Sequence, residues 1–112
     1  LHQLVHARPH PLFYPIENYF LGVKEKKEVE LAIHFRKTVD RDYLQWAIHN
    51  IVTYSNVTIP ANILHIHGTA DKLFPLRNVN AHYKIKGGGH FMVYNRADEI
   101  SRILCRELEA VK

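Results

Sequence analysis

The sequence predicts an α/β protein in which a helical segment is followed by two parallel strands and a C-terminal helix. Before Pro60 the apolar residues recur with the period of an α-helix, and after it they form short continuous runs. The runs at 62–67 and 81–86 each end at glycine, as buried parallel strands that lead into tight loops do. The order of helices, strand, loop, strand and helix is typical of the end of an α/β sheet.

The segment 1–60 is predicted to be helical after a proline-containing start. Residues 10–15 form an aromatic loop whose prolines cannot continue a helix. The mixed-charge run 24–28 is interpreted as a solvent-facing helix start. The apolar stripe of the helix that follows consists of Leu31, Phe35 and Val39, at i, i+4 and i+8.

Asp40 is well placed to cap a further helix. Trp46 is expected to widen the buried face of that helix. Its other apolar positions follow the helical template and are Leu44, Ala47, Ile48 and Ile51.

The segment 61–112 is predicted to hold both strands and a last helix. Asn95 is expected to cap this helix, with Asp98 and Glu99 in its first turn, where the helix dipole favours them. Its buried stripe is predicted to be Ile100, Ile103, Leu104, Leu108 and Val111.

Composition narrows the classes of function. The formal charge of +4 is spread along the chain rather than gathered in a patch, which argues against nucleic acid as a partner. No apolar run approaches the ~20 residues that cross a bilayer, and no segment resembles a signal peptide. The single cysteine, Cys105, excludes an internal disulfide and fits a reducing, cytoplasmic location; we expect an ordinary semi-buried thiol.

Two motifs carry the chemistry. The segment 65–75 reads HIHGTADKLFP, and the segment 86–91 reads KGGGHF. Each places a polar residue on a tight loop after a strand: Asp71 in the first and His90 in the second. An acid and a histidine are two of the three groups of a nucleophilic hydrolase.

With these motifs the chain resembles the C-terminal half of an α/β-hydrolase-fold protein. In that family the acid follows a strand in a pattern like His-Gly-x-x-Asp-x-x-x-Pro, and the histidine follows the last strand in a Gly-Gly-His turn. His67 to Pro75 and Gly88 to His90 match these patterns in the family's order. The resemblance implies that segment 1–60 is a cap or lid, and 40–48 is similar to the cap of a bacterial subgroup of the family.

The resemblance implies that His90 is the general base and Asp71 its orienting partner, acting on a small carbonyl substrate without a cofactor. The Gly-x-Ser-x-Gly elbow of the family is absent from the sequence. Ser55 follows a predicted helix without glycines, and Ser101 lies within the last helix, as does Cys105. All three are interpreted as structural, so the chain alone is predicted to be inactive.

Other residues leave alternatives open. The pairs His2/His6 and His6/His10 have helical spacing, and His65 and His67 share a strand face. However, Pro9 and Pro11 break any helix through His10, and the lack of a supporting acidic or cysteine cluster argues against a metal site. His67 is expected to support the acid loop by a hydrogen bond, and His65 to be a satisfied buried histidine. The aromatic residues at 13, 14, 19 and 20 fit either an acyl pocket under a lid or core packing.

Two classes of function therefore remain. The chain is either a fragment of an esterase-like hydrolase or a truncated, non-catalytic relative that serves binding or assembly. Two strands leave open edges, so the missing surface is expected to come from the N-terminal half of a parent protein or from a second copy.

Overall fold

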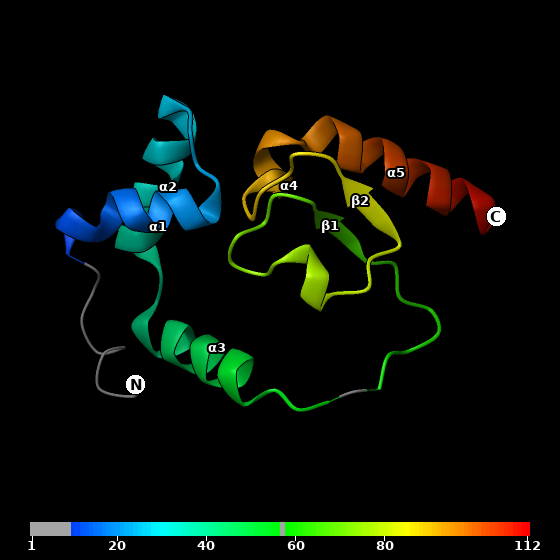
Figure 1. The fold of residues 1–112 in the computed structure, drawn as a ribbon, viewed down its shortest axis with the longest axis horizontal. Helices are drawn as coiled ribbons and strands as arrows, with labels where there is room; N and C mark the ends of the chain where they lie inside the picture. Colours follow the sequence, from blue (N-terminus) through cyan, green and yellow to red (C-terminus); the bar gives the residue numbers. More distant parts are fainter. Residues whose placement is uncertain (1–9, 57) are drawn as a thin grey trace.

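The computed structural model describes residues 10–56 and 58–112 (Figure 1). Three helices come first, α1 (Tyr14–Leu21), α2 (Lys26–Thr38) and α3 (Arg41–Thr53). Strand β1 (Ile66–Gly68), strand β2 (Tyr83–Ile85), the short helix α4 (Met92–Asn95) and the long helix α5 (Ala97–Ala110) follow. The 3₁₀ turns Pro11–Phe13 and Leu76–Asn78 precede α1 and separate the strands, respectively.

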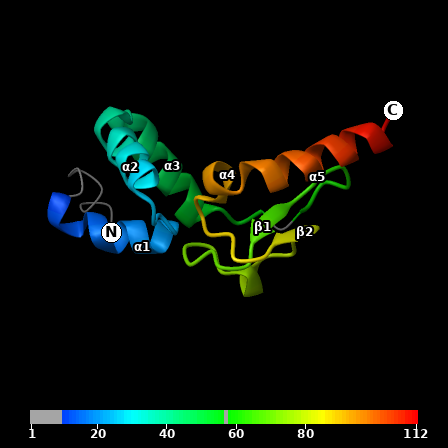
Figure 2. The same cartoon turned by 90° about the horizontal axis from the view of Figure 1, so that it is seen from above.

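Strands β1 and β2 are neighbours and run parallel, as the sequence predicts, with His67 in register with Lys84. Helix α5 lies along one face of this pair (Figure 2). The Tyr83 hydroxyl on β2 donates a hydrogen bond to the Glu107 carboxylate on α5, and Ile85 on β2 is fully buried. The mixed α/β class is thus confirmed, whereas both strands are shorter than the predicted runs 62–67 and 81–86.

The predicted loop at 10–15 is instead a 3₁₀ turn followed by the first residues of α1. Pro15 lies in the first turn of α1, where a missing amide hydrogen breaks no helical hydrogen bond. Gly22 ends this helix with a φ of 74°, a left-handed conformation that glycine adopts without a Cβ clash.

The prediction of a fully solvent-facing start for α2 is wrong at Glu28, which is buried. Glu28 accepts hydrogen bonds from the amides of Lys24 at 2.7 Å and Glu25 at 3.0 Å, as part of a capping box. Burial raises the pKa of its carboxyl, but these amides and the Asn95 side chain outweigh burial and lower it below its usual value. Asn95 is the last residue of α4, and its side chain contacts Glu28. The prediction that Asn95 caps α5 is wrong, because Arg96 occupies the N-cap position of that helix.

Asp40 caps α3 as predicted, since its carboxylate accepts the amide hydrogen of Tyr43 at 2.8 Å. The expected burial of Trp46 is wrong, because this side chain is 61% exposed. No residue of α3 is buried, and in Figure 1 the helix lies away from the sheet. The predicted apolar positions Leu44, Ala47 and Ile48 are only half-buried, and Ile51 is 57% exposed.

Helix α5 begins with Asp98 and Glu99 in its first turn, as predicted. Of its predicted buried stripe, only Ile103 is buried, while Leu108 is 64% exposed. Cys105 is exposed as well, which corrects the expectation of a semi-buried thiol. The fold therefore leaves most of this stripe in solvent.

The core of the described residues is small and the shape extended. The buried apolar residues are Val23, Ala32, Ile85 and Ile103. The radius of gyration is 16.0 Å, against about 13 Å for a compact domain of this length. Within residues 10–56 and 58–112, no helix combines the length and the hydropathy of a membrane span.

Candidate acid–histidine site

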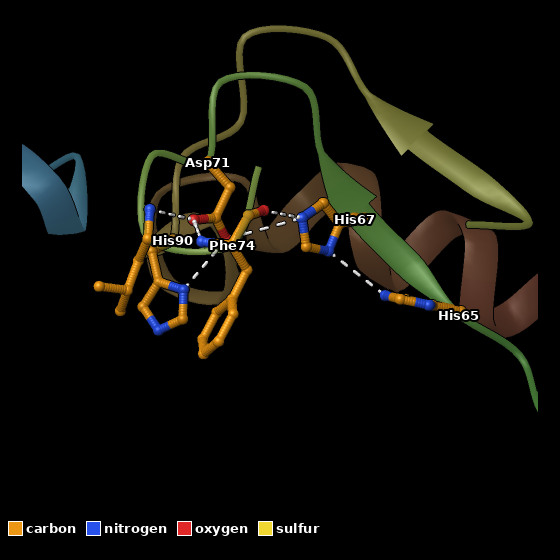
Figure 3. A network of polar contacts seen from close by, with 6 residues as sticks. His65, His67, Asp71, Phe74 and His90 are labelled. Atoms are coloured by element: carbon orange, nitrogen blue, oxygen red, sulfur yellow. Dashed lines mark hydrogen bonds and ion pairs between the residues drawn. The ribbon is translucent and has the colours of Figure 1, made fainter. Parts of the chain in front are cut away.

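Asp71 lies on the tight loop that follows β1, and its two carboxylate oxygens have separate roles (Figure 3). Oδ1 accepts hydrogen bonds from the amides of Leu73 at 2.9 Å and Phe74 at 2.8 Å. Oδ2 lies 3.0 Å from Nδ1 of His90. The loop's own backbone therefore fixes the carboxylate while one oxygen remains available to the histidine.

His90 lies on the glycine turn after β2. The two loops approach so closely that a Cβ on Gly68 would come within 2.1 Å of the carbonyl oxygen of Gly88. The amide of Ala70 donates to that same carbonyl at 2.9 Å, and the amide of Gly87 donates to the Thr69 hydroxyl at 2.9 Å. Glycine at these positions lets the two loops bond backbone to backbone, which sets the distance between the acid and the histidine.

The site thus brings together the two residues that the sequence selects. Burial raises the pKa of the Asp71 carboxyl, but the Phe74 amide, the His90 ring and the Leu73 amide lower it below its usual value. An ionised carboxylate only accepts hydrogen bonds, so Nδ1 of His90 donates to it, and in the neutral form of the ring Nε2 then carries the lone pair. The His90 side chain is 33% exposed, so this arrangement can take a proton from a neighbouring group.

The turn between α1 and α2 packs directly against the histidine loop. The amide of Phe91 donates to the carbonyl of Leu21 at 2.9 Å. A Cβ on Gly22 would lie 3.2 Å from Cα of Gly89, so these two glycines meet backbone to backbone. Sequence reasoning missed this contact, because nothing in the two separate glycines indicates that they meet.

His67 supports the acid loop, as predicted. Its Nε2 lies 2.7 Å from the carbonyl oxygen of Phe74, and its Nδ1 lies 3.3 Å from Nε2 of His65. His67 is buried, whereas His65 is only half-buried and so corrects the expectation of full burial. The Phe74 ring packs against the His90 ring with centroids 5.4 Å apart, a role that the sequence did not single out.

No nucleophile hydrogen-bonds to His90 among residues 10–56 and 58–112. Ser55 follows α3, and Ser101 and Cys105 lie on α5; all three are exposed. His2 and His6, which the metal hypothesis includes, lie outside the described residues. The described residues contain no group of three or more His, Cys, Asp or Glu side chains placed to hold a metal ion.

None of the aromatic residues at 13, 14, 19 and 20 lines the cavity that the described residues form beside the site loops. Phe13, Tyr19 and Phe20 are exposed, and the Lys72 ammonium lies 4.0 Å from the centroid of the Tyr19 ring. The cavity of about 320 Å³ between the α1–α2 turn and the site loops is instead lined mainly by polar and charged residues and glycines. Its walls are Gly22, Lys24, Glu25, Glu28, Ala70, Lys72, Gly87, Gly89, Asn95 and Arg96.

The geometry defines a carboxylate–imidazole pair held by two loops at the carboxyl ends of adjacent parallel strands. Comparison with protein-family models, curated proteins and solved structures finds no match for this chain. The functional argument therefore depends on the geometry and on the motifs around Asp71 and His90.

Proposed function

We propose that the chain is part of an α/β-fold hydrolase, esterase-like, that acts on a small ester or other carbonyl substrate. The observation that carries the proposal is the 3.0 Å contact between Oδ2 of Asp71 and Nδ1 of His90. In a Ser-His-Asp triad the acid holds the imidazole in this tautomer, and Nε2 then accepts the proton of the nucleophile. His90 is the base and then the acid, and Asp71 is its orienting partner.

The nucleophile and the oxyanion-binding amides then come from a polypeptide segment outside this sequence. The sequence contains no Gly-x-Ser-x-Gly elbow, and exposed apolar side chains on α3 and α5 offer surface for such a segment to cover. In this proposal segment 1–60 is the cap and 61–112 the end of the α/β core, and the partner is the N-terminal half of the parent or a second copy.

A second candidate is a truncated relative that binds or assembles without catalysis. The observation that favours it is the absence of any serine or cysteine bonded to His90 within the described residues. Such a module would keep the acid–histidine pair only as a structural link between its two loops.

The gene sequence upstream of Leu1 distinguishes the two candidates. If an in-frame Gly-x-Ser-x-Gly segment precedes Leu1, the longer protein should hydrolyse a nitrophenyl ester. His90→Ala should abolish this activity, whereas His34→Phe, an exposed site on α2, should leave it unchanged. An upstream frame without such an elbow, or a longer protein whose turnover is insensitive to His90→Ala, would rule out the hydrolase proposal.

A further inference from the structure

Phe74 connects three parts of the site at once (Figure 3). Its amide donates to Oδ1 of Asp71 at 2.8 Å, and its ring packs on the ring of His90. Its carbonyl oxygen lies 2.7 Å from Nε2 of His67, which projects from β1. Because residue 75 is proline, the peptide bond after Phe74 has no amide hydrogen, so this carbonyl is its only hydrogen-bonding group.

The contact with Phe74 determines the tautomer of His67. A carbonyl oxygen only accepts, so the ring nitrogen 2.7 Å away must carry a hydrogen. Nδ1 of the neutral ring then has the lone pair and accepts from Nε2 of His65, 3.3 Å away. In the opposite tautomer, the lone pair of Nε2 would face the carbonyl oxygen and the contact would be repulsive.

The same Nε2–H group of His67 also lies near the carboxylate of Asp71. Nε2 of His67 is 3.8 Å from Oδ2 of Asp71, the oxygen that holds His90. This distance is too long for a direct hydrogen bond, so the hydrogen bond by which His67 is linked to the pair is the one to the Phe74 carbonyl. His67 is buried, so water does not readily replace it.

We propose that His67 is a positioning residue for the Asp71–His90 pair, an inference that deepens the proposed function and rests on it for its catalytic meaning. By donating to the Phe74 carbonyl, His67 fixes the exit of the acid loop to β1. That bond keeps the Phe74 amide on the carboxylate and the Phe74 ring against the imidazole. Loss of the donor frees this loop and lets the His90 ring leave the orientation in which Nδ1 faces Asp71.

The test compares His67→Gln with His67→Phe in the full 112-residue chain. The glutamine amide can donate to the Phe74 carbonyl from nearly the position of Nε2, whereas phenylalanine keeps a ring without a donor. The exposed site His34→Phe is the control for loss of a histidine elsewhere. The readout is the tautomer of His90, measured by long-range ¹H–¹⁵N correlation of the imidazole rings, with a thermal melt of each variant.

We expect the ratio of Nδ1–H to Nε2–H tautomers of His90 to fall about fivefold in His67→Phe, the loss that one neutral hydrogen bond represents. His67→Gln should restore the ratio to within about twofold, and His34→Phe should leave it unchanged. A folded His67→Phe with an unchanged ratio, or a folded His67→Gln as impaired as His67→Phe, would overturn the proposal. So would an Nδ1–H tautomer of His67 in the unmodified chain, a measurement that requires no variant.

This readout requires neither nucleophile nor substrate. If no upstream elbow exists, the hydrolase proposal fails while the tautomer of His90 still reports on His67. If the longer protein is an active hydrolase but the tautomer ratio of His90 is the same in His67→Phe as in the unmodified chain, only the positioning role of His67 fails.

Discussion

Gly68→Ala should destabilise the fold more than any other glycine-to-alanine change near the site. A Cβ on Gly68 would lie 2.1 Å from the carbonyl oxygen of Gly88, 2.5 Å from its carbonyl carbon and 3.1 Å from its Cα. These are backbone atoms, so no side-chain rotation can relieve the overlap. The two loops that carry Asp71 and His90 must separate.

The size of the effect follows from two costs and one gain. Forced expansion of a packed contact costs about 1–3 kcal/mol. Separation of the loops also breaks the hydrogen bond from the Ala70 amide to the Gly88 carbonyl, at a cost of about 1 kcal/mol. The lower entropy of the unfolded alanine chain returns about 0.4–1 kcal/mol. We expect a net loss of about 1–3.6 kcal/mol.

Urea unfolding at one fixed chain concentration measures this loss, and Gly88→Ala is the matched control. A Cβ on Gly88 would meet the Ile85 side chain at 3.1 Å and Cα of Gly68 at 3.2 Å, which is tight but short of overlap. Its cost should therefore be smaller than that of Gly68→Ala. Equal midpoints and slopes for Gly68→Ala and the unmodified chain would refute the close approach of the two loops.

Three further predictions concern the site and the assembly. The pKa of Asp71 in the folded chain lies below its unfolded value of about 4. The Asp71 carboxylate therefore stabilises the fold above about pH 4, and this stabilisation is lost as the pH falls through the folded pKa. In urea melts, the stability difference between the unmodified chain and Asp71→Asn should shrink over the same pH range. The 112-residue chain should not hydrolyse a nitrophenyl ester above buffer. Turnover that is lost in His90→Ala but retained in Ser55→Ala, Ser101→Ala and Cys105→Ala would contradict this. Sedimentation equilibrium should show self-association of the 112-residue chain, and a clean monomer at micromolar concentration that melts in one sharp transition would contradict this.

The strands and the acid–histidine pair could be predicted because their signals are local. A short apolar run that ends in glycine indicates a strand followed by a tight loop, and Asp71 and His90 come directly after two such runs. Parallel neighbouring strands place such loops at the same end of the sheet. The 3.0 Å contact between the two side chains follows from this topology.

Features set by contacts between distant segments could not be predicted. Asn95 has the side chain of a helix cap, but the buried carboxylate of Glu28 on α2 is its partner instead. Glu28 in turn belongs to a charged run that normally faces solvent, and its capping box and this contact provide the hydrogen bonds that its buried carboxylate needs. The meeting of Gly22 with Gly89 has no sequence signal at all.

The burial of the apolar stripe on α5 also could not be predicted from the sequence. The helical period correctly identifies one apolar side, yet Ile103 is buried while Leu104 and Leu108 are not. Periodicity states which side of a helix avoids water, but the covering surface must be supplied by other parts of the structure. Strands β1 and β2 are too short to cover a helix of 14 residues, so the rest of the stripe needs a wider sheet or another chain. The exposed stripe and the proposed hydrolase function, which needs a nucleophile from outside this sequence, are both consistent with additional polypeptide beside the acid–histidine pair.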